Sequence, residues 1–152
     1  MRSARSPQRN QSTQNGFGLL ECLFALFILS VGILGTSAMV SNSFRFTDAA
    51  ALQTQSVALA YDLADKIRAN SQSVGSYSTD VGDTYNNPPD CASASCSSGQ
   101  IAQADLADWK TKLASNLPSG DGATVITADD ATINVQWSDR GTARTYSLVV
   151  AL

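Results

Sequence analysis

An apolar segment near the N-terminus is the feature that most limits what this chain can fold into. Residues 17–40 contain a single charged side chain, that of Glu21. As a helix these 24 residues would be about 36 Å long, and the hydrocarbon core of a bilayer is about 30 Å thick. The segment is therefore long enough to span a membrane with some tilt.

Charged residues are distributed unevenly around this segment. Residues 1–16 carry three arginines and no acid, whereas residues 41–152 carry 7 basic and 12 acidic side chains. A basic start, an apolar segment and an acidic remainder predict a membrane-inserted chain whose basic end stays in the cytoplasm. The net charge of −3 over the whole chain argues against a nucleic-acid partner.

Three ordinary explanations of the apolar segment compete. A secretory signal peptide would use Thr36 and Ala38 as its small residues, but its apolar core would exceed the usual ~7–15 residues and would contain a carboxylate. Lipoprotein processing before Cys22 is disfavoured because Glu21 stands where a small residue is needed. A plain single-pass anchor accounts for everything except Glu21 and its neighbours.

Glu21 separates these explanations. A carboxylate inside an apolar membrane segment is costly and marks a functional site by default. Either Glu21 lies close enough to the interface to stay hydrated, or a cation neutralises it. Cleavage between Gly16 and Phe17 would create that cation, because the new α-amine at Phe17 would lie about one helical turn from Glu21 or face it from an adjacent subunit.

The junction that contains Glu21 resembles a known signal. The sequence GFGLLECLFALFILSVGILG, which follows a short basic leader, resembles the class III signal of type IV pilins and type II secretion pseudopilins. In that family a membrane prepilin peptidase cuts after the glycine and N-methylates the new N-terminal phenylalanine. The resemblance implies that residues 1–16 are the leader, that Gly16 and Phe17 flank the cleavage site, that Phe17 is methylated, and that Glu21 guides docking into the fibre.

The same resemblance implies a minor type IV pilin that takes part in pilus assembly, in priming or in the tip complex. Its expected partners are prepilin peptidase, other minor and major pilins, the inner-membrane pilus assembly platform and membrane lipid; no cofactor is expected. The expected location is the inner membrane, with the head in the periplasm, and later the extracellular pilus. A minor pseudopilin of a type II secretion system and a membrane-anchored or secreted binding module stay open as alternatives.

One long helix is predicted over about residues 17–70. No proline occurs between residues 17 and 87, and no glycine between residues 36 and 74. Residues 17–40 form its transmembrane and assembly half. In residues 41–70, apolar residues recur at helical spacing among charged ones, which predicts an amphipathic half that lies on a globular head. These apolar residues are Phe44, Leu52, Leu59, Leu63 and Ile67.

Small residues share one narrow face of the predicted membrane helix. They are Gly18, Cys22, Ala25, Gly32 and Thr36. Small residues let helices approach closely in lipid, so this face either packs against neighbouring subunits or reflects the general abundance of glycine and alanine in membrane helices. In the first case Cys22 is a packing residue and not a reactive thiol.

Residues 71–152 are predicted to form a small periplasmic head of the α+β class. Residues 71–100 have the composition of a loop. The apolar spacing of residues 104–117 predicts a short amphipathic helix, which Pro118 ends, with Trp109 in the core.

Three β-type runs complete the head. They span residues 123–127, 132–137 and 144–150, with turns at residues 129–131 and 139–141. A three-stranded antiparallel sheet packed on the long helix would cover the amphipathic face of residues 44–67, with Trp137 in the core.

Cys91 and Cys96 enclose four residues of the predicted loop. Two thiolates without further cysteine or histidine ligands cannot close a tetrahedral metal site. Because a periplasmic head lies in an oxidising compartment, a disulfide is favoured over two free thiols.

The sequence predicts neither an enzyme nor a metal site. The chain has no histidine, which removes Ser-His-Asp and Cys-His catalysis and histidine-ligated zinc. Nucleotide-binding and common serine-nucleophile motifs are absent. The aspartate pairs Asp80/Asp83 and Asp129/Asp130 are interpreted as turn residues, without the regular ligand spacing of a calcium site.

Overall fold

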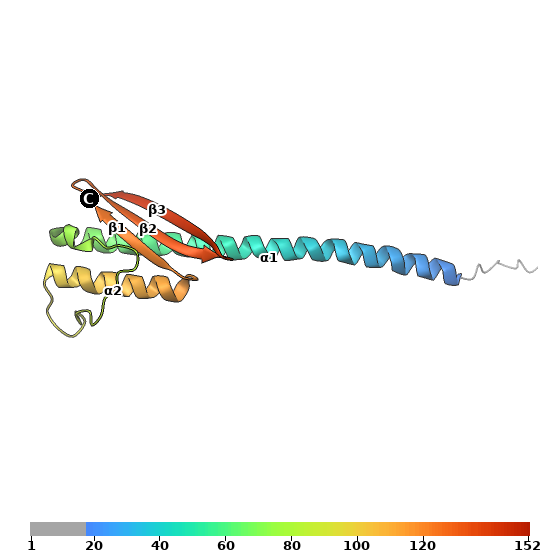
Figure 1. Ribbon diagram of the computed structural model, residues 1–152, viewed down its shortest axis with the longest axis horizontal. Helices are drawn as coiled ribbons and strands as arrows, with labels where there is room; N and C mark the ends of the chain where they lie inside the picture. Colours follow the sequence, from blue (N-terminus) through green and yellow to red (C-terminus); the bar gives the residue numbers. More distant parts are fainter. Residues whose placement is uncertain (1–17) are drawn as a thin grey trace, which may run out of the picture. The chain divides into compact units, whose positions relative to one another are not determined.

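The computed structural model describes residues 18–152. Its elements follow in the order α1 (Leu19–Ala69), η1 (Ser71–Tyr77), α2 (Ser98–Asn116), β1 (Asp121–Ile126), β2 (Asp130–Asp139) and β3 (Thr142–Ala151). The long helix and the three-stranded antiparallel sheet confirm the predicted α+β fold (Figure 1). The chain divides into two compact units between Phe44 and Arg45. We call residues 18–44 the N-terminal segment and residues 45–152 the head.

Helix α1 contributes its last part to the core of the head. Its fully buried residues recur at helical spacing, at Ser56, Ala60, Leu63, Ala64 and Ile67. The predicted apolar stripe is wrong at its first member, because the Phe44 side chain is 66% exposed. Phe44 belongs to the N-terminal segment, and Leu52 is the first residue of the stripe to pack on the core.

The sheet has the strand order β1-β2-β3, and both strand pairs are antiparallel. Within β2, alternate residues are buried, so that Ile133, Val135 and Trp137 face the core. The register places Leu148 opposite Ile133 and Tyr146 opposite Val135 on that face. This alternation confirms the predicted inner face of the sheet, which lies alongside α1 in the head (Figure 1).

The two turns of the sheet differ in how well they were predicted. Arg140 and Gly141 connect β2 to β3, and both have positive φ angles, 51° and 80°, as a tight two-residue hairpin requires. The β1–β2 turn lies at residues 127–129, two residues before the predicted position. Ala131 belongs to β2 and not to the turn, because it is fully buried and pairs with both neighbouring strands.

Helix α2 begins at Ser98, six residues before the predicted start. The side chain of Ser97 accepts a hydrogen bond from the Gln100 backbone N–H, and the Gln100 side chain accepts one from the Ser97 N–H. This capping box satisfies backbone donors that the first helical turn leaves free. The predicted loop over residues 71–100 therefore also contains η1 and the start of α2.

Trp109 lies at the centre of the core. Its side chain is fully buried, and its Nε1 donates a hydrogen bond to the Leu59 carbonyl oxygen of α1 at 3.0 Å. Its Cη2 atom packs so closely on Gly122 of β1 that a Cβ atom there would collide with the ring. Trp137 is also buried, so both tryptophans are core residues, as predicted.

Candidate assembly surface

Glu21 lies in the first turn of α1. Its backbone N–H donates to the Gly18 carbonyl oxygen at 3.0 Å, and its side chain is exposed. A carboxylate at this position interacts favourably with the positive end of the helix dipole. The first turn therefore presents a negative charge at the start of an apolar helix, on a surface that nothing else in the described chain covers.

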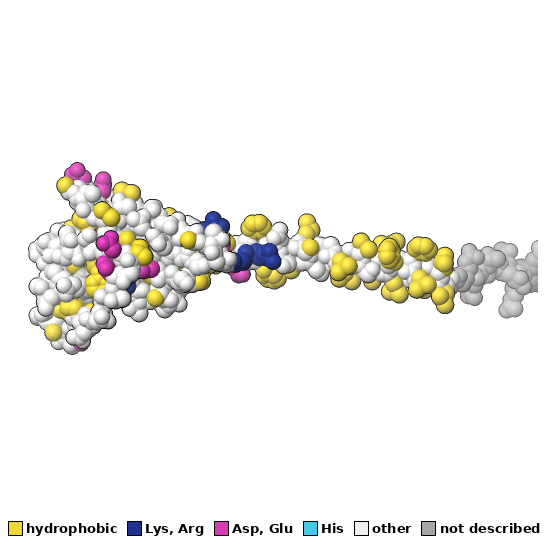
Figure 2. All heavy atoms as spheres, in the orientation of Figure 1, with side chains coloured by type: hydrophobic (Ala, Val, Ile, Leu, Met, Phe, Trp, Pro, Cys, Tyr) yellow, Lys and Arg dark blue, Asp and Glu magenta, His cyan; other side chains and the backbone are white. Residues whose placement is uncertain are grey.

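The N-terminal segment exposes most of its large hydrophobic side chains. More than half of the surface of each is accessible, at Leu19, Leu20, Leu23, Phe24, Leu26, Phe27, Ile28, Leu29, Val31, Ile33, Leu34, Met39, Val40 and Phe44. Yellow side chains accordingly cover this part of α1 in Figure 2. An apolar surface of this extent marks a membrane or protein contact. Among the described residues, α1 is the one helix long and apolar enough to cross a membrane, by length and composition.

Three hydroxyl side chains within the N-terminal segment are satisfied by the helix itself. Ser30 Oγ donates to the Phe27 carbonyl oxygen at 2.7 Å, and Ser37 Oγ donates to the Ile33 carbonyl oxygen at 2.8 Å. Thr36 Oγ1 donates to the same carbonyl at 3.0 Å. Because lipid offers no hydrogen-bond partners, such internal bonds are what a helix in a bilayer requires.

The predicted packing residues all lie exposed on the N-terminal segment, at Gly18, Cys22, Ala25, Gly32 and Thr36. A Cβ atom added at Gly18 or Gly32 would meet no atom within 4 Å. Nothing in the described chain therefore requires glycine at these two positions. Their role as a packing face stays a prediction.

Ion pairs connect α1 to α2 on the outside of the head. Lys66 Nζ lies 2.8 Å from Asp108 Oδ2, while Lys112 Nζ lies 2.9 Å from the same oxygen and 3.2 Å from Asp62 Oδ2. The hydrogen bond to Asp108 is the main cause of a raised Lys112 pKa. The sequence showed these charges but not their partners, which come from different helices.

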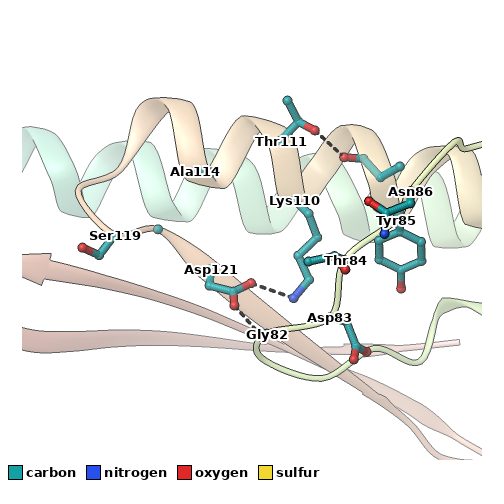
Figure 3. A pocket seen from close by; sticks show the side chains of 12 residues that line it. Gly82, Asp83, Thr84, Tyr85, Asn86, Lys110, Thr111, Ala114, Ser119 and Asp121 are labelled. Atoms are coloured by element: carbon teal, nitrogen blue, oxygen red, sulfur yellow. Dashed lines mark hydrogen bonds and ion pairs between the residues drawn. The ribbon is translucent and has the colours of Figure 1, made fainter.

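A second polar cluster attaches the loop after η1 to the rest of the head (Figure 3). Lys110 Nζ, on α2, donates to Asp121 Oδ1 at 2.6 Å and to the Asp80 carbonyl oxygen at 2.7 Å. The Gly82 N–H donates to Asp121 Oδ2 at 2.7 Å. The Lys110 side chain is only 10% exposed. One carboxylate thus joins α2, β1 and the loop beside an open hollow of about 520 Å³.

Three of the four predicted turn aspartates lie in turns, Asp80 and Asp83 after η1 and Asp129 between β1 and β2. Asp83 Oδ2 accepts hydrogen bonds from the Asp80 N–H at 2.7 Å and from Thr79 Oγ1 at 3.1 Å, as expected of a turn carboxylate. Asp130 instead begins β2, as its pairing with Ala151 shows. No group of three or more His, Cys, Asp or Glu side chains that could hold a metal ion occurs within residues 18–152.

Cys91 and Cys96 form a disulfide, with their Cα atoms 5.5 Å apart. Cys96 directly precedes Ser97, the cap of α2, so the bond constrains the chain where it enters that helix. A short closed loop removes little entropy from the unfolded chain, which limits the effect to local shape. Cys22 is a free, exposed thiol on the N-terminal segment.

Two families of known proteins match adjoining parts of the chain. Residues 11–37 match the prokaryotic N-terminal methylation motif, and residues 38–107 match the family of the type IV pilin Tt1218. The chain is thus similar to type IV pilins over residues 38–107 and has the methylation motif directly before them. Comparison with curated proteins and with solved structures gave no match.

The methylation motif bears on the N-terminal segment. It implies processing by prepilin peptidase, and the apolar helix is consistent with anchoring in the inner membrane. The predicted cleavage residues, Gly16 and Phe17, lie outside the described residues.

Acid is expected to destabilise the head. Burial alone raises the pKa of Asp121, but the hydrogen bonds from Lys110, Gly82 and Gly122 outweigh it and hold the pKa below its usual value. For Asp108 the bonds from Lys66 and Lys112 outweigh burial in the same way. Such carboxyls stabilise the folded state above their unfolded pKa of about 4, and this contribution is lost as the pH falls through the lower folded pKa.

The melting temperature of the head is therefore expected to stay level from neutral pH to about pH 5 and to fall below about pH 4. Circular dichroism of the full chain in mild detergent measures this melting temperature at each pH. The Asp121→Asn variant should show a smaller fall over the same range, because one of the responsible carboxyls is gone. An unchanged melting temperature in strong acid would contradict the expectation.

Proposed function

We propose that this protein is a minor type IV pilin that takes part in pilus assembly, in priming the fibre or in its tip complex. The proposal includes that it is a minor pilin of the PilV kind, the type IV pilus modification protein, which its sequence resembles. The proposal includes cleavage between Gly16 and Phe17 and N-methylation of Phe17. It is carried by one observation, the exposed carboxylate of Glu21 in the first turn of an apolar, exposed helix.

Charge neutralisation is the proposed role of Glu21. In a low-dielectric setting a lone carboxylate is unfavourable, whereas a carboxylate next to an ammonium group is stabilised. Cleavage after Gly16 would create an α-amine at Phe17. Docking would then pair this amine, or that of a neighbouring subunit, with Glu21, so that a subunit enters the fibre in one register.

The exposed apolar helix and the small-residue face would supply the packing in this proposal. Van der Waals contact, and not hydrophobic expulsion, drives helix association in lipid. At Gly18 and Gly32 the helix surface has open space that a neighbouring helix would fill. The head, with its disulfide-constrained segment at Cys91 and Cys96, would offer a surface specific to its partners.

Glu21→Ala is expected to leave membrane insertion intact and to abolish incorporation into pili. The measurement compares the amount of the subunit in sheared pili with its amount in the membrane fraction of the same cells. Asp65→Ala is the matched control, because Asp65 is another exposed acid of α1 and lies outside the apolar segment. Normal incorporation of the Glu21→Ala subunit would refute the proposed role.

Mass spectrometry of the mature chain separates the proposal from its alternatives. A mature N-terminus at N-methylated Phe17 supports a pilin or a pseudopilin, whereas cleavage near Ala38 or an intact leader supports a binding module. Deletion of the gene then distinguishes the first two, because loss of pili indicates the pilus and loss of protein secretion indicates a type II system.

A further inference from the structure

The basic side chains of the head differ in how closely they approach a carboxylate. Each of its three lysines has a carboxylate oxygen 2.6–2.9 Å from its Nζ atom. Arg140 and Arg144 are different, since their nearest carboxylate oxygens lie at 3.9 and 4.0 Å. Their side chains are 50% and 58% exposed. Most of the hydrogen-bonding capacity of these two guanidinium groups is therefore free for another partner.

These arginines gather with Arg45 at one end of the head. Arg140 Nη2 donates to the Arg45 carbonyl oxygen at 3.0 Å, which places the β2–β3 turn against the first residues of α1 in the head. Arg144 follows four residues later on β3, and Arg45 is exposed. Figure 2 shows dark blue side chains gathered at this end. We call Arg45, Arg140 and Arg144 the arginine cluster.

One member of the arginine cluster, Arg45, lies close to the apolar segment along the chain, and Arg140 contacts it. Val40 ends the apolar segment, and Arg45 follows five residues later. Five residues span at most about 18 Å even when fully extended, so Arg45 lies within that distance of the last residue of the apolar segment. Phe46, next to Arg45, is 71% exposed and offers an apolar side chain at the same level.

The charge elsewhere on the head has the opposite sign. The arginine cluster and its two nearby acids, Asp48 and Asp139, carry a net charge of +1, whereas the other charged residues of the head comprise 4 basic and 10 acidic side chains. An anionic surface therefore attracts this end of the head and repels the rest.

The backbone conformation at Arg140 is one that arginine does not favour. Its φ angle is 51°, in the left-handed region. Asparagine, aspartate or glycine is favoured at the first position of such a two-residue hairpin turn, and other residues are strained there. An unfavourable residue at an exposed turn points to a function of its side chain.

We propose that the arginine cluster binds the phosphate groups of anionic phospholipids in the outer leaflet of the membrane that anchors the chain. This contact would hold the head against the bilayer in one orientation before the subunit leaves the membrane. Guanidinium groups suit phosphate because they donate two parallel hydrogen bonds. The inference depends on membrane anchoring and not on Glu21 or on a role in the pilus.

Hydrogen–deuterium exchange of the full chain in lipid nanodiscs tests the proposal. The amides of residues 138–146 should exchange more slowly in discs that contain phosphatidylglycerol than in discs of phosphatidylcholine alone, and high salt should remove the difference. Each arginine near an anionic surface shifts the equilibrium between the free and the lipid-bound head about fivefold towards the bound state. Equal exchange in both lipids would overturn the proposal. Protection by inorganic phosphate in neutral discs would also overturn it, because that result indicates a site for free anions.

Variants separate lipid contact from folding. Arg140→Asn with Arg144→Gln should remove the lipid-dependent protection, whereas Arg68→Gln, an arginine in the last turn of α1, should retain it. Arg140→Asn alone should keep or raise the melting temperature of the head, because asparagine tolerates the turn conformation. A double variant that is folded and still protected in anionic discs would refute the role of the cluster.

Discussion

Replacing Gly120 with alanine is expected to destabilise the head by about 3 kcal/mol or more. A Cβ atom on Gly120 would collide with the Leu113 carbonyl oxygen and would lie 2.7 Å from Leu117 Cβ. Both neighbours belong to the last turn of α2 and its cap, where the Leu117 N–H donates to the same Leu113 oxygen at 3.0 Å. Backbone atoms cannot move aside as a flexible side chain can, so α2 and β1 would have to separate.

The melting temperature of the full chain, followed by near-ultraviolet circular dichroism, should fall by about 10 °C or more in this variant. Gly99→Ala is the matched control. The nearest atom to a Cβ at Gly99 is Ser76 Oγ at 3.9 Å, an ordinary contact, and alanine favours the helix. The control should therefore melt at or above the wild-type temperature. Equal melting of wild type and Gly120→Ala would show that the turn after α2 is not as tight as described.

Trp109→Ala is expected to have a comparable or larger effect, about 3–5 kcal/mol. The side chain is fully buried among α1, α2 and the sheet, and its removal leaves a cavity that rigid elements on three sides cannot close. Natural domains have a net stability of only about 5–15 kcal/mol. The variant should therefore populate the unfolded state at moderate temperature, and near-ultraviolet circular dichroism should show the loss of fixed packing.

Trp109→Phe separates the volume of the ring from its hydrogen bond. Phenylalanine fills most of the space but cannot donate to the Leu59 oxygen. We expect it to cost about 1–2 kcal/mol, well below the alanine variant. If Trp109→Ala melts no lower than Trp109→Phe, the core does not depend on the volume of this side chain.

The candidate assembly residues were predictable because their signal is local. Gly16, Phe17 and Glu21 lie within six consecutive residues next to a long apolar segment, and no tertiary contact is needed to recognise that pattern. The structure adds that Glu21 lies exposed in the first turn of α1. The start of α2 was also visible in principle, since Ser97 and Gln100 have the spacing of a capping box, a signal that the loop-like composition outweighed.

Contacts between distant residues were not predictable in this way. The composition of residues 71–100 predicts a loop, yet the backbone of Gly82 is held by Asp121, 39 residues away, and Asp121 in turn by Lys110. A single aspartate or lysine in the sequence does not indicate its partner, because that depends on how two elements pack.

Periodicity and composition alone determined the long helix and the three strands with their inner face. These depend on which residues follow one another, and hydrophobic spacing of 3.6 or 2 residues is readable along the chain. Tertiary structure alone decided where the covered face of α1 begins, why Gly120 and Gly122 cannot carry a side chain, and that Arg45 and Arg140 meet. Each of these depends on the distance between atoms far apart in sequence, which only the packing of helices against the sheet sets.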